Sequence, residues 1–169
     1  MVLFVKRVGI VGGGIMGSQI ADIMAINGKE VIIRDVSEDF TKKTMEIVNK
    51  NLDELVQFHA TRAEKEIERI ENKDGIQLSD EQKEKIKNVL KPKFNQESKT
   101  ETIAHISTTT NIEDFNDVDL VIEAVVENIE IKKKVFNDLD THTPKHAILA
   151  TNTSSLSITE IAAATKRPE

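Results

Sequence analysis

Three glycines near the start of the chain, Gly12, Gly14 and Gly17, have the types and the spacing that suit binding of a dinucleotide. Gly12 permits a tight turn, Gly14 leaves room for a pyrophosphate, and Gly17 lets a helix pack closely against a strand. A helix that begins here directs free N–H groups and the positive end of its dipole toward phosphates. The spacing therefore predicts a phosphate-binding turn, which Ile15 and Met16 complete.

An acid, Asp35, lies 18 residues beyond Gly17, at the end of the next apolar run. A carboxylate at this place accepts hydrogen bonds from both hydroxyls of an adenosine ribose and repels a 2′-phosphate, so it favours NAD over NADP. Arg34 could hold a 2′-phosphate, but strand alternation directs it away from the side of Asp35. FAD and S-adenosylmethionine sites share this topology, and at this point they remain alternatives.

These residues need a sheet to position them, and the chain has five short apolar runs separated by helical patterns. We expect strands at residues 7–11, 31–33, 106–109, 120–125 and 147–150, and helices at residues 18–27, after Ser37, at 131–141 and at 158–164. This alternation predicts an α/β fold, a doubly wound parallel sheet of the Rossmann type with strand order 3-2-1-4-5. Ligands bind such sheets at the carboxyl ends of the strands, where Gly12, Asp35, Ala124 and Asn152 fall.

A segment of about residues 53–101 interrupts this alternation and is richer in charge than the rest of the chain. Ala63, Ile67 and Ile70 form a narrow apolar stripe, and Ser79 with Gln82 has the spacing of a capping box that opens a second helix. The pattern predicts a protruding helical hairpin with a largely wetted surface. It is either a solvated insertion or a functional arm.

Composition excludes several classes of function. The 169 residues include 23 Lys and Arg against 29 Asp and Glu, a net charge of −6, with no Trp, Tyr or Cys. An acidic chain without a basic block is not expected to bind nucleic acid, and no apolar run is long enough for a membrane span. The four histidines lack metal-ligand spacing, so no metal site is expected. The absence of Cys is consistent with an intracellular protein, and we expect a cytoplasmic one.

Three segments together make the sequence similar to the 3-hydroxyacyl-CoA dehydrogenase family, and in particular to its short-chain 3-hydroxybutyryl-CoA type. They are VGIVGGGIMG at residues 8–17, EAVVEN at 123–128 and NTSSLSIT at 152–159. By composition alone, the third segment could be turn chemistry. The resemblance implies an NAD-dependent interconversion of (S)-3-hydroxyacyl-CoA and 3-oxoacyl-CoA, in fatty-acid β-oxidation or butanoate metabolism.

The same resemblance implies roles for individual residues. Asp35 would hold the adenosine ribose, and Glu127 and Lys132 would contact the cofactor, with Glu127 near the nicotinamide ribose. Ser154 would be the catalytic serine and would form hydrogen bonds near the nicotinamide and the substrate oxygen. Asn152 would help to form the same edge of the site. In the family the hairpin helps to clamp the CoA portion, for which Arg62 and Lys65 are the basic candidates here.

The sequence departs from the family pattern at its end. The family's acid–base histidine lies in an HFFNP segment shortly after NTSS and is paired with a glutamate, and an all-helical dimerising domain follows. Neither has a counterpart in residues 1–169. We therefore expect residues 1–169 to be the NAD-binding domain of a longer homodimeric enzyme, with little or no turnover alone. A stand-alone NAD-binding or redox-sensing module is the alternative.

Overall fold

The computed structural model describes residues 4–168, which contain a five-stranded parallel sheet. The strands are β1 (Arg7–Val11), β2 (Glu30–Arg34), β3 (Ile106–Thr109), β4 (Leu120–Glu123) and β5 (Ile148–Thr151). Their order in the sheet is β3-β2-β1-β4-β5. This confirms the α/β class, the parallel pairing and the strand order expected from the sequence.

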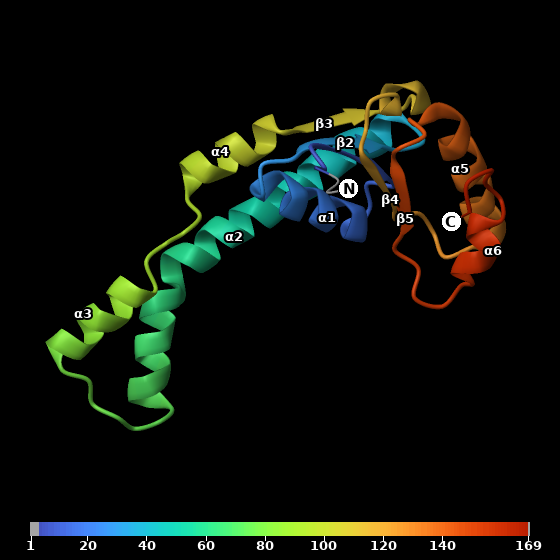
Figure 1. The fold of residues 1–169 in the computed structure, drawn as a ribbon. Helices are drawn as coiled ribbons and strands as arrows, with labels where there is room; N and C mark the ends of the chain where they lie inside the picture. The colour runs from blue at the N-terminus through green and yellow to red at the C-terminus, as the bar shows by residue number, and fades with distance from the viewer. Residues whose placement is uncertain (1–3, 169) are drawn as a thin grey trace. The chain divides into compact units, whose positions relative to one another are not determined.

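Six α-helices and one short 3-10 helix accompany these strands within the described residues. They are α1 (Ile15–Ile26), α2 (Glu38–Asn72), α3 (Asp80–Val89), α4 (Gln96–Ala104), η1 (Ile112–Phe115), α5 (Ile129–His142) and α6 (Ile158–Ala162). Within the sheet unit, α1 lies beside β1 and β2, whereas α5 lies beside α6 and the η1 segment (Figure 1). None of the helices in residues 4–168 combines the length and apolar character that a bilayer crossing requires.

Within the described residues, the sheet belongs to a compact unit formed by residues 4–49 and 102–168. Its core contains buried side chains from β1, β2, η1, β4 and α5 and from the residues just before β4 and β5: Val11, Ile32, Phe115, Val118, Val121, Leu139 and Ala147. Gly9 on β1 makes room for this core, because a Cβ there would lie 2.8 Å from the fully buried Phe115 ring. Burying this apolar area supplies the main driving force for the unit to fold.

Residues 50–101 form a second compact unit, the hairpin unit. Ala63 and Ile67 of the expected stripe are buried, and the capping box of Ser79 and Gln82 that opens α3 is confirmed. The helix α3 buries none of its residues, as expected for a solvated surface. Two features were missed: α2 is one continuous helix of 35 residues, and α4 begins soon after Pro92.

Candidate functional site

Four strands of the sheet end in a single row, which we call the carboxyl edge. The last residues of β2, β1, β4 and β5 are register partners across the sheet: Arg34, Val11, Glu123 and Thr151. The residues that directly follow these strand ends are, in the same order, Asp35, Gly12, Ala124 and Asn152. The sequence prediction that these four residues share one edge is therefore confirmed.

The glycine turn at this edge has the geometry that its residue types imply. Gly12 has a φ of 97°, a value that favours glycine, and a Cβ there would lie 2.8 Å from the Ala124 carbonyl oxygen. A Cβ on Gly17 would lie 1.8 Å from the Gly12 carbonyl oxygen, so Gly17 is required for close packing of α1. A Cβ on Gly14 would meet no atom within 4 Å. The space beside Gly14 is thus open to a ligand.

The N-terminus of α1 lies at this turn and has no side-chain cap. Its N-cap residue is Gly14 and its first turn contains no acid, so no protein carboxylate there neutralises the positive end of the helix dipole. By contrast, Ser79, Asn128 and Ser157 cap α3, α5 and α6 through their side chains. These features fit a pyrophosphate at α1.

Asp35 is held in place by two backbone N–H groups. Gly13 donates to Oδ2 over 2.9 Å, and Val36 donates to Oδ1 over 2.7 Å. The side chain is half-buried, so it still faces solvent at the carboxyl edge. The Nε of Arg34 donates to the carbonyl oxygen of Thr110 over 3.3 Å. This arrangement fits the predicted contact of Asp35 with a ribose.

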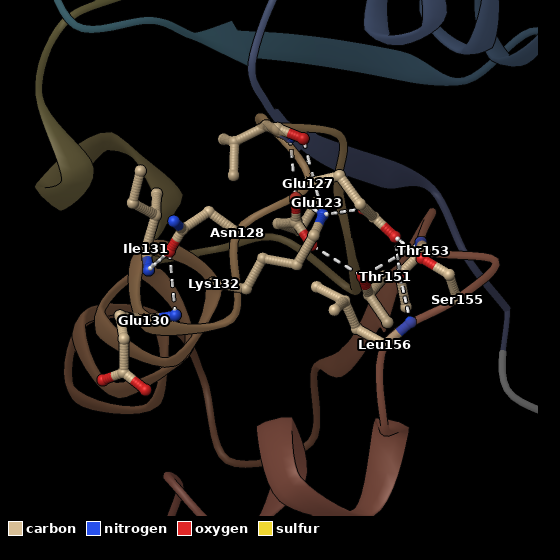
Figure 2. Close-up of polar contacts among 11 residues, drawn as sticks. Glu123, Glu127, Asn128, Glu130, Ile131, Lys132, Thr151, Thr153, Ser155 and Leu156 are labelled. Atoms are coloured by element: carbon tan, nitrogen blue, oxygen red, sulfur yellow. Dashed lines mark hydrogen bonds and ion pairs between the residues drawn. The ribbon is translucent and has the colours of Figure 1, made fainter.

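A second polar group occupies the carboxyl edge beyond β4 and β5 (Figure 2). The exposed carboxylate of Glu127 accepts hydrogen bonds at Oε1 from the hydroxyls of Thr153 and Ser155, and its Oε2 lies 3.3 Å from Nζ of Lys132. The hydrogen bond from Thr153, followed by those from Ser155 and Lys132, lowers the pKa of Glu127 to about 2. Glu127 is therefore a fixed anion at neutral pH.

Lys132 is almost completely buried and its ammonium group is turned toward the protein. Its side chain is 1% exposed, and Nζ lies 2.7 Å and 3.0 Å from the two carboxylate oxygens of Glu123. Nζ also donates to the carbonyl oxygen of Val125 over 3.4 Å. In this structure the partners of Lys132 are the carboxylates of Glu123 and Glu127 and the carbonyl oxygen of Val125. Its cofactor contact remains a prediction.

Glu123 was not predicted as a site residue, yet it anchors this group. It is fully buried, and besides Lys132 it accepts hydrogen bonds from the Val125 N–H over 2.7 Å and from the Thr151 hydroxyl over 2.6 Å. The sequence did offer a signal for Glu123. It is a charged residue at the end of an otherwise apolar strand, and a lysine follows nine positions later in an amphipathic helix.

The two polar residues predicted from the NTSSLSIT segment lie at the same edge. Asn152 donates its backbone N–H to the carbonyl oxygen of Glu123 over 2.8 Å, which fixes the start of the loop. Ser154 is exposed, and its hydroxyl makes no hydrogen bond within residues 4–168. Their contacts with cofactor and substrate remain predictions.

Two of the histidines belong to the opposite edge of the sheet. His105 directly precedes β3, with Nδ1 2.6 Å from Glu30, and His146 precedes β5, with Nε2 3.5 Å from Asp119. Residues that precede parallel strands lie at the amino edge, away from Glu127 and its partners. No group of three or more potential metal ligands is present within residues 4–168.

In the hairpin unit, the two basic candidates differ in their surroundings. Arg62 donates to the carbonyl oxygens of Leu90 over 3.1 Å and Lys91 over 2.8 Å, so its guanidinium ties α2 to the end of α3. Lys65 is exposed. Arg62 therefore has a structural role in the hairpin whether or not it also contacts a ligand.

The family model described as "3-hydroxyacyl-CoA dehydrogenase, NAD binding domain" matches residues 7–80 and 72–169. The chain belongs to this family. A 3-hydroxybutyryl-CoA dehydrogenase of Clostridioides difficile is 37% identical over 163 residues, which are 96% of this chain and 46% of the relative. A peroxisomal fatty acid β-oxidation multifunctional protein of Arabidopsis thaliana is 34% identical over 96% of this chain and 18% of its own length.

A solved structure of the same family shares the fold. The crystal structure of an (S)-3-hydroxybutyryl-CoA dehydrogenase from Ralstonia eutropha is 30% identical, has a TM-score of 0.71 and covers 98% of this chain and 47% of that one. The chain thus spans about half the length of the 3-hydroxybutyryl-CoA dehydrogenases that it matches. The family match confirms NAD as the cofactor expected from Asp35 and the glycine turn.

Proposed function

We propose that this chain is the NAD-binding part of an enzyme that interconverts (S)-3-hydroxyacyl-CoA and 3-oxoacyl-CoA. The observation that carries the proposal is the single row of strand ends from β2 to β5. It brings the glycine turn and Asp35 onto one edge with the group formed by Glu127, Thr153 and Ser155. Residues 1–169 would then be one cofactor domain, with the hairpin as an insertion at about residues 53–101.

The residues divide the work of binding along this edge. Asp35 and the α1 N-terminus would bind the adenosine ribose and the pyrophosphate. Glu127, an anion at neutral pH, would accept a hydrogen bond from the nicotinamide ribose, and Ser154 offers a free hydroxyl to the substrate oxygen. NAD, when bound, accepts the hydride from the substrate. We propose that Asn152 keeps the Ser154 loop at this edge through its bond to β4.

Removing the proton of the 3-hydroxyl requires a base within hydrogen-bond reach. His105 and His146 precede their strands and so belong to the other edge of the sheet, which makes both unsuitable. We propose that the acid–base pair and the helices of a homodimer interface belong to a part of the enzyme outside residues 1–169, consistent with relatives about twice as long. The 169-residue chain alone should not oxidise the substrate.

The acyl-CoA partner and the location are further proposals. A hairpin arm of the family type would favour an acyl-CoA over a smaller hydroxy acid. The cytoplasmic location expected from the sequence stays a prediction, since one relative is named as peroxisomal. A stand-alone sensing module would bind NAD without a need for a CoA thioester. The enzyme and the sensing module therefore predict different outcomes when a CoA thioester is supplied as substrate.

The experiment is a chimaera in which this chain replaces the equivalent N-terminal part of the Clostridioides difficile relative. We expect NADH formation from (S)-3-hydroxybutyryl-CoA, followed at 340 nm, at a rate of about 1 per second or more. The isolated chain is the matched control and should bind NAD without producing NADH. A chimaera that binds NAD but oxidises nothing would overturn the enzyme proposal and favour the sensing module.

A further inference from the structure

A buried ion pair lies directly behind the Glu127 group. The side chains of Glu123 and Lys132 are 0% and 1% exposed, and Nζ contacts both carboxylate oxygens. Removing two charges from water costs several kcal/mol per ion, so apolar residues of similar volume often give equal or greater stability. Stability alone is thus a weak explanation for this pair.

The ion pair contacts two parts of the site, the loop that follows β5 and the carboxylate of Glu127 (Figure 2). Glu123 Oε2 accepts a hydrogen bond from the Thr151 hydroxyl. The oxygen of that hydroxyl in turn accepts a hydrogen bond from the backbone N–H of Thr153 over 3.3 Å. On the other side, Lys132 Nζ lies 3.3 Å from Oε2 of Glu127. One buried carboxylate therefore fixes the loop that donates to Glu127 and also the lysine that contacts Glu127.

The direction of these hydrogen bonds matters. Because an ionised carboxylate can only accept, Glu123 forces the Thr151 hydroxyl to donate inward, which leaves its oxygen free to accept from Thr153. An amide at the same position could donate to Thr151 and so reverse this order. It would also leave Glu127 as the only carboxylate in contact with Lys132.

We propose that Glu123 is a positioning residue, which sets Glu127 and the residues 151–155 loop through Lys132 and Thr151 for the nicotinamide half of the cofactor. This inference rests on the proposed function, in which Glu127 faces the nicotinamide ribose. The adenosine half depends on a different part of the edge, the glycine turn and Asp35. Loss of Glu123 should therefore weaken one half of the cofactor site selectively.

The test compares binding of NAD and of ADP, which lacks the nicotinamide ribose, to the 169-residue chain by calorimetry. For Glu123→Gln we expect the Kd for NAD to rise about tenfold or more, which is about 1.4 kcal/mol. The Kd for ADP should stay within about twofold of the wild-type value, since Asp35 and the turn are untouched. The ratio of the two constants is a readout that a merely structural role would leave unchanged.

Two further variants keep the outcome decisive. Glu123→Gln/Lys132→Met removes both buried charges, so the Lys132 ammonium is not left without its buried carboxylate. It should show the same selective loss of affinity for NAD. Lys133→Met is the control. Lys133 is the next residue of α5, and its salt bridge to Glu160, at 2.5 Å, is more exposed than the pair of Lys132 and Glu123. It should bind both ligands like the wild type.

Each other result contradicts the positioning role or its premise. Equal loss of NAD and ADP in both Glu123 variants would mean that Glu123 supports the fold only. Unchanged binding of both ligands would show that the pair has no influence on the site. Failure of the wild-type chain to bind either ligand would instead overturn the proposed function.

Discussion

Asp35 Oδ2 accepts a hydrogen bond from the backbone N–H of Gly13 over 2.9 Å, which joins the end of β2 to the glycine turn after β1. The ribose-binding acid and the phosphate-binding turn are thus one connected piece of backbone and side chain. A carboxylate has about four acceptor positions, so the bonds from Gly13 and Val36 leave capacity for ribose hydroxyls.

Asp35 should control the choice between NAD and NADP. We expect the wild-type chain to bind NAD about tenfold or more tightly than NADP, about 1.4 kcal/mol, because a 2′-phosphate would approach the carboxylate. Asp35→Asn keeps an acceptor for Gly13 and removes the charge, so the preference should fall below about threefold. Calorimetry with both cofactors measures this, and Asp39→Asn is the control for a nearby charge. Equal affinities in the wild type would contradict the prediction.

Gly14 and Gly17 should respond differently to the same added methyl group. Gly17→Ala places Cβ against the Gly12 carbonyl oxygen and should lower the free energy of unfolding by about 1–3 kcal/mol. Gly14→Ala meets open space at an ordinary φ of −66°, so stability should change by less than about 1 kcal/mol. NAD binding should nevertheless weaken. Urea denaturation and calorimetry separate the two effects, and unchanged NAD affinity in Gly14→Ala would show that no ligand occupies that space.

Gly13 should be intolerant of a side chain because of Thr44. A Cβ on Gly13 would lie 2.0 Å from Oγ1 of Thr44, a stiff, buried residue that donates to the Gly13 carbonyl oxygen over 3.1 Å. Gly13→Ala should cost about 1–3 kcal/mol in the free energy of unfolding. Adding Thr44→Ala should restore part of this loss, since the nearest atom is removed. A double-mutant cycle that shows simple additivity would exclude the contact.

The sheet could be predicted from the sequence because each of its elements has a local signal. Short apolar runs predicted the five strands, and helical patterns after the first, second and fourth runs predicted parallel crossovers. The cap of α3 followed from the spacing of Ser79 and Gln82. The helix α4 was missed because residues 93–105 contain few apolar side chains. Its start depends on Asn95, which accepts from the Ser98 N–H over 2.9 Å.

The internal supports of the site could not be predicted in the same way. The glycine turn, Asp35 and the NTSSLSIT segment were recognisable as motifs. The bond between Gly13 and Thr44 joins residues 31 positions apart, and no sequence period relates them. For Glu123, the resemblance indicated the segment but assigned no role, because the role depends on Lys132 and Thr151 coming together in three dimensions.

The bonds to Glu127 should be visible in its titration. Thr153→Val removes the largest cause of the lowered pKa, so the pKa of Glu127 should rise from about 2 toward its ordinary value. Ser157→Ala is the matched control, since Ser157 is a hydroxyl of the same segment that instead caps α6. Carboxylate NMR titration of the two variants checks this. An unchanged pKa in Thr153→Val would show that the hydroxyl does not bond to Glu127 in solution.

The same group should give stability a defined dependence on pH. Its folded pKa lies below the unfolded one, so Glu127 contributes fully above the unfolded value of about 4.3, and its contribution decreases as the pH falls toward 2. The difference in unfolding free energy between the wild type and Glu127→Gln should therefore be constant from pH 6 to 8 and shrink between about pH 4.5 and 2. Urea denaturation at several pH values measures that difference. A difference that grows as the pH is lowered would have the wrong sign for a carboxylate held ionised by Thr153, Ser155 and Lys132.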